Sequence, residues 1–207
     1  MEAFEHIHEA WKRLGYPFET MIPSYATAIG SSADRPEALS DLMGIILNDG
    51  IRLPMYEVER LQFALDTPYE AHFARGRSPG ERVLKLEISQ VVKDCLFQVV
   101  ENGTARRARG AYLAVDGTEM RVGGKTGTGD HRYEIYGRGG RLIESRVMNR
   151  AASFVFIMGD RFFGNITAYV PGPEAADYTF TSALPVAIFK LLSPTLMTMM
   201  DSVDFLA

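Results

Sequence analysis

The sequence predicts an α+β fold in which helices flank an antiparallel sheet. Apolar residues recur with helical spacing through the first hundred residues, and two-residue alternation follows between residues 119 and 170. A last helical segment closes the chain. Helices followed by consecutive strands are typical of an antiparallel sheet with helices packed on it. The 207 residues, 46% of them apolar, are enough for a single domain, residues 1–207, with a sizeable core.

Three helices are expected before the strands. Gly15 ends the first helix, Pro36 opens the second at a position that suits a first turn, and Gly103 ends the third and longest. We expect Cys95 to lie on the buried stripe of the third helix and to be inert. The apolar stripes are Phe4, Ile7, Trp11 and Leu14; Leu39, Leu42, Met43 and Ile46; and Leu84, Ile88, Val91, Val92, Cys95, Leu96 and Val99.

Alternating and β-branched residues predict the strands, and glycine clusters predict the turns between them. Short extended pieces are expected at Ile51–Leu53 and Tyr56–Phe63, and longer strands at Glu119–Thr128, Ala152–Met158 and Phe162–Val170. Arg132–Tyr136 and Leu142–Val147 flank a run of glycines and predict a hairpin, and a closing helix is expected from Pro185 to Leu192.

Composition excludes several classes of function. With 22 basic against 26 acidic residues, the chain has no overall positive field with which to bind nucleic acid. Its single cysteine excludes an internal disulfide, and its four histidines are too scattered to predict a metal site. No apolar run reaches the length of a membrane span, and the first eleven residues lack the layout of a signal peptide. We expect neither a cofactor nor a nucleic-acid partner.

The sharpest local motif is the glycine-rich stretch from Gly123 to Gly129, which contains Gly-Lys-Thr-Gly-Thr. A phosphate-binding loop is one interpretation of Gly-Lys-Thr, but that motif needs a glycine where this chain has Glu119. The segment that follows Thr128 also has no helical spacing. The alternative is the Lys-Thr-Gly strand of serine acyltransferases that act on penicillin-like substrates.

The chemistry of such a strand follows from its residue types. Thr126 and Thr128 would point to one face, so that two hydroxyls can hold one carboxylate. Gly127 would let a ligand lie close to the backbone, and Lys125 would supply a fixed positive charge near a proton transfer. The three letters alone favour a glycine-rich edge strand with an exposed lysine.

The flanking segments resemble the transpeptidase domain of class A penicillin-binding proteins. A long helix that ends in Gly103-Thr104-Ala105 precedes the Lys-Thr-Gly strand, as it does in that family. The similarity runs in order from about Ala10 to Ser193. The other similar segments are Ile22–Ser31, Pro36–Leu39, Asn48–Pro54 and Ala183–Lys190.

The resemblance implies an enzyme that polymerises glycan strands in one domain and cross-links D-Ala-D-Ala stem peptides in another. Lys125 would sit beside the nucleophile, Thr126 and Thr128 would hold the terminal carboxylate, and the backbone N–H of Thr128 would form half of the oxyanion hole. Gly127 would lie against the ligand, and β-lactams would bind as mimics of the peptide. The resemblance also implies an extracytoplasmic protein anchored in the membrane.

Two motifs of the family are missing from these 207 residues. No serine has a lysine three positions later, the nearest pair being Ser89 and Lys93, and there is no Ser-x-Asn. We therefore expect the C-terminal portion of a transpeptidase domain, inactive by itself, with a sheet edge open beside the strand of Ile166. That edge should be covered by a second copy, by the Asp130–Arg150 hairpin or by the tail. The alternative is a non-catalytic binding module built on the same sheet, which the long Asp130–Arg150 segment favours.

Overall fold

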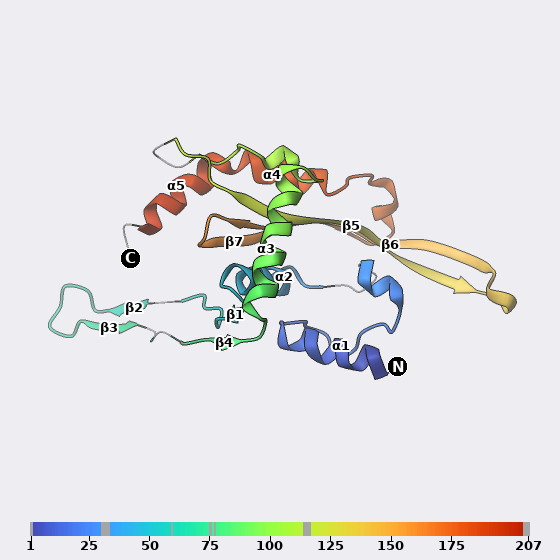
Figure 1. Cartoon of the computed structure of the whole chain (residues 1–207), viewed down its shortest axis with the longest axis horizontal. Coiled ribbons are helices and arrows are strands. Elements are labelled where there is room, and N and C mark those ends of the chain that lie inside the picture. The colour runs from blue at the N-terminus through green and yellow to red at the C-terminus, as the bar shows by residue number, and fades with distance from the viewer. Residues whose placement is uncertain are drawn as a thin grey trace.

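The computed structural model describes residues 2–29, 34–58, 60–74, 76, 78–113 and 117–204 (Figure 1). Gly30, Ser31 and the other residues between these ranges lie outside the description. The helices are α1 (Glu2–Arg13), α2 (Pro36–Leu47), α3 (Leu86–Glu101), α4 (Ala183–Leu191) and α5 (Ser193–Asp204). The strands are β1 (Ile51–Arg52), β2 (Arg60–Phe63), β3 (Ala71–Ala74), β4 (Glu81–Arg82), β5 (Val122–Tyr136), β6 (Leu142–Met158) and β7 (Phe162–Pro171).

An antiparallel sheet in the order β5-β6-β7 forms the centre of the molecule. Lys125 lies opposite Val155, and Phe154 lies opposite Ile166, which confirms the three neighbouring strands expected from the sequence. The predicted hairpin is continuous with β5 and β6, so these strands reach 15 and 17 residues. Its far half projects from the body as a two-stranded arm (Figure 1).

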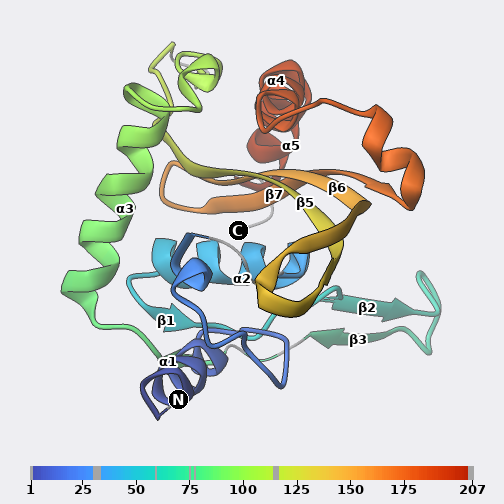
Figure 2. The same ribbon diagram turned by 90° about the vertical axis from the view of Figure 1, so that its right-hand side faces the viewer.

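Helices cover both faces of this sheet (Figure 2). Because side chains alternate along a strand, β6 sends Phe154 and Phe156 to one face and Val155 and Ile157 to the other. The first pair packs under α4, as expected for the closing helix, with Val186, Phe189 and Tyr112. The second pair packs on α2 and α3, with Ile46, Leu47, Leu96 and Phe97.

The buried face of α3 differs from the expected stripe. Cys95 is exposed, and so are Ile88 and Val91, at 48% and 64% of their surface. The prediction that Cys95 is buried was therefore wrong. The helix instead turns a narrower face to α2 and β5, because Leu96 and Phe97 already fill the gap between them. The buried residues of α3 are Ser89, Leu96, Phe97 and Val100.

The sequence did not reveal the partners of the short strands. β1 pairs with β4, and β2 pairs with β3 in a hairpin that projects from the body (Figure 1). β3 and β4 are mostly exposed and only four and two residues long, so they carry little hydrophobic alternation. α5, which follows α4 after a single residue, was also missed.

The outer edge of β7 is open in the described part of the chain. There β7 pairs with β6 alone, and neither the arm nor α5 adds a strand to it. The expectation that the Asp130–Arg150 hairpin covers this edge was wrong, because that hairpin extends β5 and β6 along their own direction. Pairing with a second copy stays a prediction.

Phe189 is the residue on which the α4 face of the core converges. It is fully buried, and its ring lies 4.4 to 5.2 Å from the rings of Tyr112, Phe154 and Phe156. Phe189→Ala should lower the free energy of unfolding by about 3–5 kcal/mol, because it removes apolar contacts and leaves a cavity. Leu191→Ala, two residues later on the same helix and 78% exposed, should change it by less than about 0.5 kcal/mol. Urea unfolding of both variants measures the difference, and similar losses in the two would contradict this core.

Candidate functional site

The Lys-Thr-Gly sequence lies on β5, at the outer edge of the sheet opposite β7. The N–H of Gly159 donates to the carbonyl of Arg121 (2.9 Å), which marks these facing residues as a hydrogen-bonded pair. Hydrogen-bonded and non-hydrogen-bonded pairs alternate along an antiparallel ladder. Thr126 and Thr128 therefore fall at non-hydrogen-bonded positions, and their backbone N–H and C=O groups point away from β6 toward the free edge.

The ammonium of Lys125 is held at this free edge. Its side chain is exposed, and Nζ donates to the carbonyl oxygen of Thr126 at 2.6 Å. That carbonyl points outward, so the charge and the outward N–H of Thr128 occupy the same edge of the sheet. The structure thus brings together, within one short stretch of strand, a cation and a backbone donor that no other described strand uses.

The hydroxyls of Thr126 and Thr128 lie on one face of β5, as expected, and each has a partner. Thr126 is buried and its Oγ1 shares a hydrogen bond with Oγ1 of Thr104 (2.7 Å). Oγ1 of Thr128 accepts the N–H of Ser182 (2.8 Å). Because a hydroxyl carries one hydrogen and accepts through its oxygen, Thr128 can also donate its own O–H, for which the described residues provide no acceptor.

Thr104 and Ser182 are the site residues that sequence reasoning missed. Thr104 follows α3 directly, inside the Gly-Thr-Ala segment that carried the resemblance, and this was the available signal. Ser182 precedes α4 and contributes a backbone N–H, for which no side-chain pattern exists.

A second anchor holds the segment that carries Ser182. Arg150 of β6 donates from Nε and Nη2 to the carbonyl of Phe180, at 2.9 and 2.7 Å, and its guanidinium lies 5.4 Å from the Phe180 ring. The segment before α4 is therefore tied to the sheet at two places, through Arg150 and through Thr128. These two contacts hold the N–H of Ser182, which donates to Oγ1 of Thr128, in place.

Two glycines of the motif, Gly124 and Gly127, differ in whether the structure would tolerate a side chain at their position. A Cβ at Gly124 would lie 2.4 Å from the carbonyl oxygen of Val155, so packing requires glycine there. A Cβ at Gly127 would have nothing within 4 Å, so the space beside this residue is open. The sheet itself therefore does not require glycine at position 127, which leaves room for a ligand close to the strand.

One further ionisable group, the phenol of Tyr112, has a structural role. Burial raises the pKa of Tyr112, whose hydroxyl donates to the carbonyl of Phe189 (2.7 Å) in the core.

No cluster of three or more His, Cys, Asp or Glu side chains in the described ranges could hold a metal ion. No single described helix is long and apolar enough to cross a membrane, and α4 with α5 meets the length and composition test only as a pair bent by 55°.

The hydrogen bond between Thr128 and Ser182 can be tested directly. Thr128→Val keeps the shape of the side chain but removes the acceptor, so the Ser182 amide should exchange with deuterium roughly two- to tenfold faster. Thr20→Val, in an exposed loop, is the control and should leave that amide unchanged. Amide exchange followed by NMR measures both, and an unchanged rate in Thr128→Val would contradict the contact.

Comparison with known proteins gives the chain a family. The family model for the penicillin binding protein transpeptidase domain matches residues 10–140. No curated protein sequence matches the chain. Solved structures with the same fold include penicillin-binding protein 3 from Mycobacterium tuberculosis in complex with aztreonam, at 18% identity and a TM-score of 0.60. PBPA from the same organism is 17% identical to this chain, with a TM-score of 0.55.

A third similar structure is the D,D-transpeptidase domain of a peptidoglycan glycosyltransferase from Eggerthella lenta, at 16% identity and a TM-score of 0.53. The matches cover 95%, 91% and 92% of this chain, but only 46%, 43% and 48% of the three solved chains. This chain thus spans less than half the length of the structures that it resembles. Its α+β fold and the family match over more than half of its residues lead to one conclusion: the chain belongs to the penicillin-binding protein transpeptidase family.

Proposed function

We propose that this chain is the C-terminal half of a peptidoglycan D,D-transpeptidase, and that β5 forms one wall of its acyl-transfer site. The observation that carries the proposal is the free edge of β5, where the Lys125 ammonium and the outward N–H of Thr128 lie beside open space at Gly127. A peptide that ends in a carboxylate needs a cation and hydroxyl donors, and its reacting carbonyl needs N–H donors.

In the proposed reaction, a serine outside these 207 residues attacks the carbonyl of the penultimate D-alanine of a stem peptide. The electron pair of that carbonyl moves onto its oxygen, which accepts the N–H of Thr128 as half of the oxyanion hole. When the carbonyl reforms, the bond to the terminal D-alanine breaks and this residue leaves with a proton as the free amino acid. An amine of a second stem then takes the acyl group and releases the serine.

The residues of this chain hold the leaving end of the peptide in that scheme. The O–H of Thr128 donates to the terminal carboxylate, and the Lys125 ammonium neutralises it. Thr126 adds a second donor when Thr104 is the donor in their shared hydrogen bond, because the O–H of Thr126 is then left for the ligand. The peptide backbone runs along β5 past Gly127, where no side chain obstructs it. The Lys125 charge also stabilises the oxyanion, since both lie at the free edge.

The solved relatives support the ligand class and the wider architecture. Penicillin-binding protein 3 from M. tuberculosis has been solved with aztreonam and with ampicillin, so β-lactams are proposed as ligands here too, as mimics of D-Ala-D-Ala. The E. lenta protein is a transpeptidase domain of a peptidoglycan glycosyltransferase, which supports a glycosyltransferase in the whole protein. We accordingly propose an extracytoplasmic enzyme that is anchored in the membrane by a segment outside this chain.

The isolated chain should form no covalent adduct with a fluorescent penicillin. Its nearest serine–lysine pair is committed to structure: the Oγ of buried Ser89 donates to Ile46 O (2.8 Å), and Lys93 Nζ bonds Leu47 O and Asp49 Oδ1. Neither group is available as a nucleophile or its base. Intact-mass spectrometry after incubation measures acylation, and a stable adduct on any serine of this chain would overturn the proposal that the nucleophile lies elsewhere.

Lys125→Ala should slow acylation in the protein that includes the serine-bearing half. Loss of a preorganised charge beside a developing oxyanion costs about 100-fold or more in rate. Because Lys125 is exposed, unfolding should change by less than about 0.5 kcal/mol. Lys85→Ala, at the exposed start of α3, is the matched control and should acylate like the wild type. A rate for Lys125→Ala within about twofold of wild type would reject the catalytic role of this strand.

The arm of β5 and β6 favours the second candidate, a non-catalytic module that binds partners through the same sheet. The coding sequence upstream of Met1 separates the two functions. Ser-x-x-Lys followed by Ser-x-Asn is expected there for the transpeptidase. A coding sequence that starts at Met1 would instead favour the module.

A further inference from the structure

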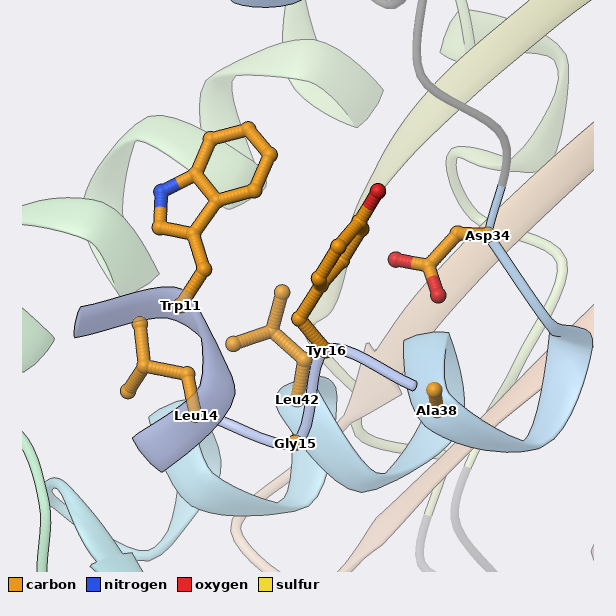
Figure 3. Close-up of a pocket in the computed structure, with 7 residues that line it drawn as sticks. All are labelled: Trp11, Leu14, Gly15, Tyr16, Asp34, Ala38 and Leu42. Carbon is orange, nitrogen blue, oxygen red and sulfur yellow. The ribbon is translucent and has the colours of Figure 1, made fainter. Parts of the chain in front are cut away.

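A small cavity lies between the end of α1 and the first turns of α2 (Figure 3). Its volume is about 170 Å³. An apolar cavity of about 150 Å³ holds a molecule the size of benzene, so there is room for about six non-hydrogen atoms. The cavity shares no residue with the Lys-Thr-Gly strand. The side chains that the argument uses are those of Trp11, Leu14, Tyr16, Asp34, Ala38 and Leu42.

Two aromatic rings form a fixed wall of this cavity. The rings of Trp11 and Tyr16 meet edge to face, with centroids 5.6 Å apart. The Tyr16 ring also contacts the rings of Phe18 and His8, with centroid distances of 5.6 and 5.7 Å. The backbone explains this placement: Gly15 has a φ of 99°, and the N–H of Tyr16 returns to the carbonyl of Trp11 (3.0 Å). Aromatic faces carry negative charge density and attract cations.

Among the described residues that line the cavity, Asp34 carries the one charged side chain. Figure 3 shows its carboxylate beside the Tyr16 ring. Oδ1 accepts the N–H of Arg35 (2.8 Å), and no ion pair in the described ranges involves Asp34. Burial raises the pKa of the Asp34 carboxyl, and the Arg35 N–H opposes that rise. Asp34 is still exposed on one side, so its carboxylate is only partly removed from water, and a bound cation would restore the electrostatic stabilisation lost by that part.

The neighbouring cations of the chain are engaged elsewhere. The Arg35 guanidinium lies 5.6 Å from the centre of the Phe18 ring, and it does not line the cavity. Arg52 pairs with Asp41 at 3.2 Å. The cavity therefore combines an aromatic wall and a carboxylate with no cation of its own.

We propose that this cavity binds a small aliphatic primary amine. The ammonium lies between the Asp34 carboxylate and the Tyr16 ring, and the carbon chain packs on Leu14, Ala38 and Leu42. Four carbons and one nitrogen fit the available volume, which makes butylammonium a suitable probe. The proposal is independent of the chemistry proposed for β5.

The single tryptophan of the chain reports on this cavity, because Trp11 is part of its wall. Titration of the full chain with butylammonium at pH 7 should change the Trp11 fluorescence saturably, with a Kd on the order of 1 mM, as expected for five heavy atoms. 1-Butanol, which has nearly the same shape without the charge, should bind at least about tenfold more weakly.

Two variants and a control complete the test. Asp34→Asn should weaken butylammonium binding by about tenfold and leave 1-butanol unchanged, while Glu37→Gln, an exposed carboxylate of α2 outside the cavity, should bind like the wild type. Ala38→Leu fills the cavity without any change of charge and should abolish both titrations; its circular dichroism melt shows that it is folded. Three results would each overturn the proposal: no saturable change in the wild type, equal affinity for 1-butanol, or undiminished amine binding in folded Asp34→Asn or Ala38→Leu.

Discussion

The antiparallel pairing of β5 with β6 is the constraint on which the rest of the molecule depends. Once Lys125 faces Val155, the two-residue period decides which side chains of β6 meet α4 and which meet α2. The same register decides which N–H and C=O groups of β5 form hydrogen bonds with β6 and which point to the free edge. If β6 slipped by one residue along β5, the backbone groups of Thr126 and Thr128 would turn toward β6. The same slip would move Phe154 to the opposite face of the sheet, out of its core. Core and site are therefore fixed by one register.

The helices keep that register in place from both sides. Phe189 packs on Phe154 and Phe156, and the segment before α4 reaches back to Thr128 and to Arg150. α3 is joined to α2 by the hydrogen bond of Ser89 and by Lys93. The hydrogen bond of Ser89 is buried and those of Lys93 and Arg150 are partly buried, so leaving them unmade would be costly, whereas the bond from Ser182 to Thr128 is exposed. The site strand is thus supported by elements that are remote from it in sequence.

The sequence predicted the parts of the fold in which local pattern and burial agree. The strands around Lys125, Phe154 and Ile166, and the helices α2 and α4, have strong periodicity and clear turn residues. It failed where exposure removes that pattern, as in β3 and β4, and where two apolar faces compete. In α3 the stripe through Cys95 is as apolar as the true face, and only the position of β5 selects between them. At the site, the side chains of the motif were foreseen, but Thr104, Ser182 and Arg150 come from other segments, and only the fold brings them to β5.

The arm of β5 and β6 has a consequence for the local stability of the site strand. From Arg132 outward the arm has hydrogen bonds but no core, and Tyr133, Tyr136 and Ile143 are all largely exposed. Such a ribbon opens at a small free-energy cost compared with a strand that is buried on both faces. A bulge between His131 and Arg132 interrupts the ladder at the boundary, so fraying that starts at the tip can stop there. Thr128 lies just inside this boundary, on the part of β5 that packs against the body, so we expect opening of the arm to end close to the site strand without separating it from β6.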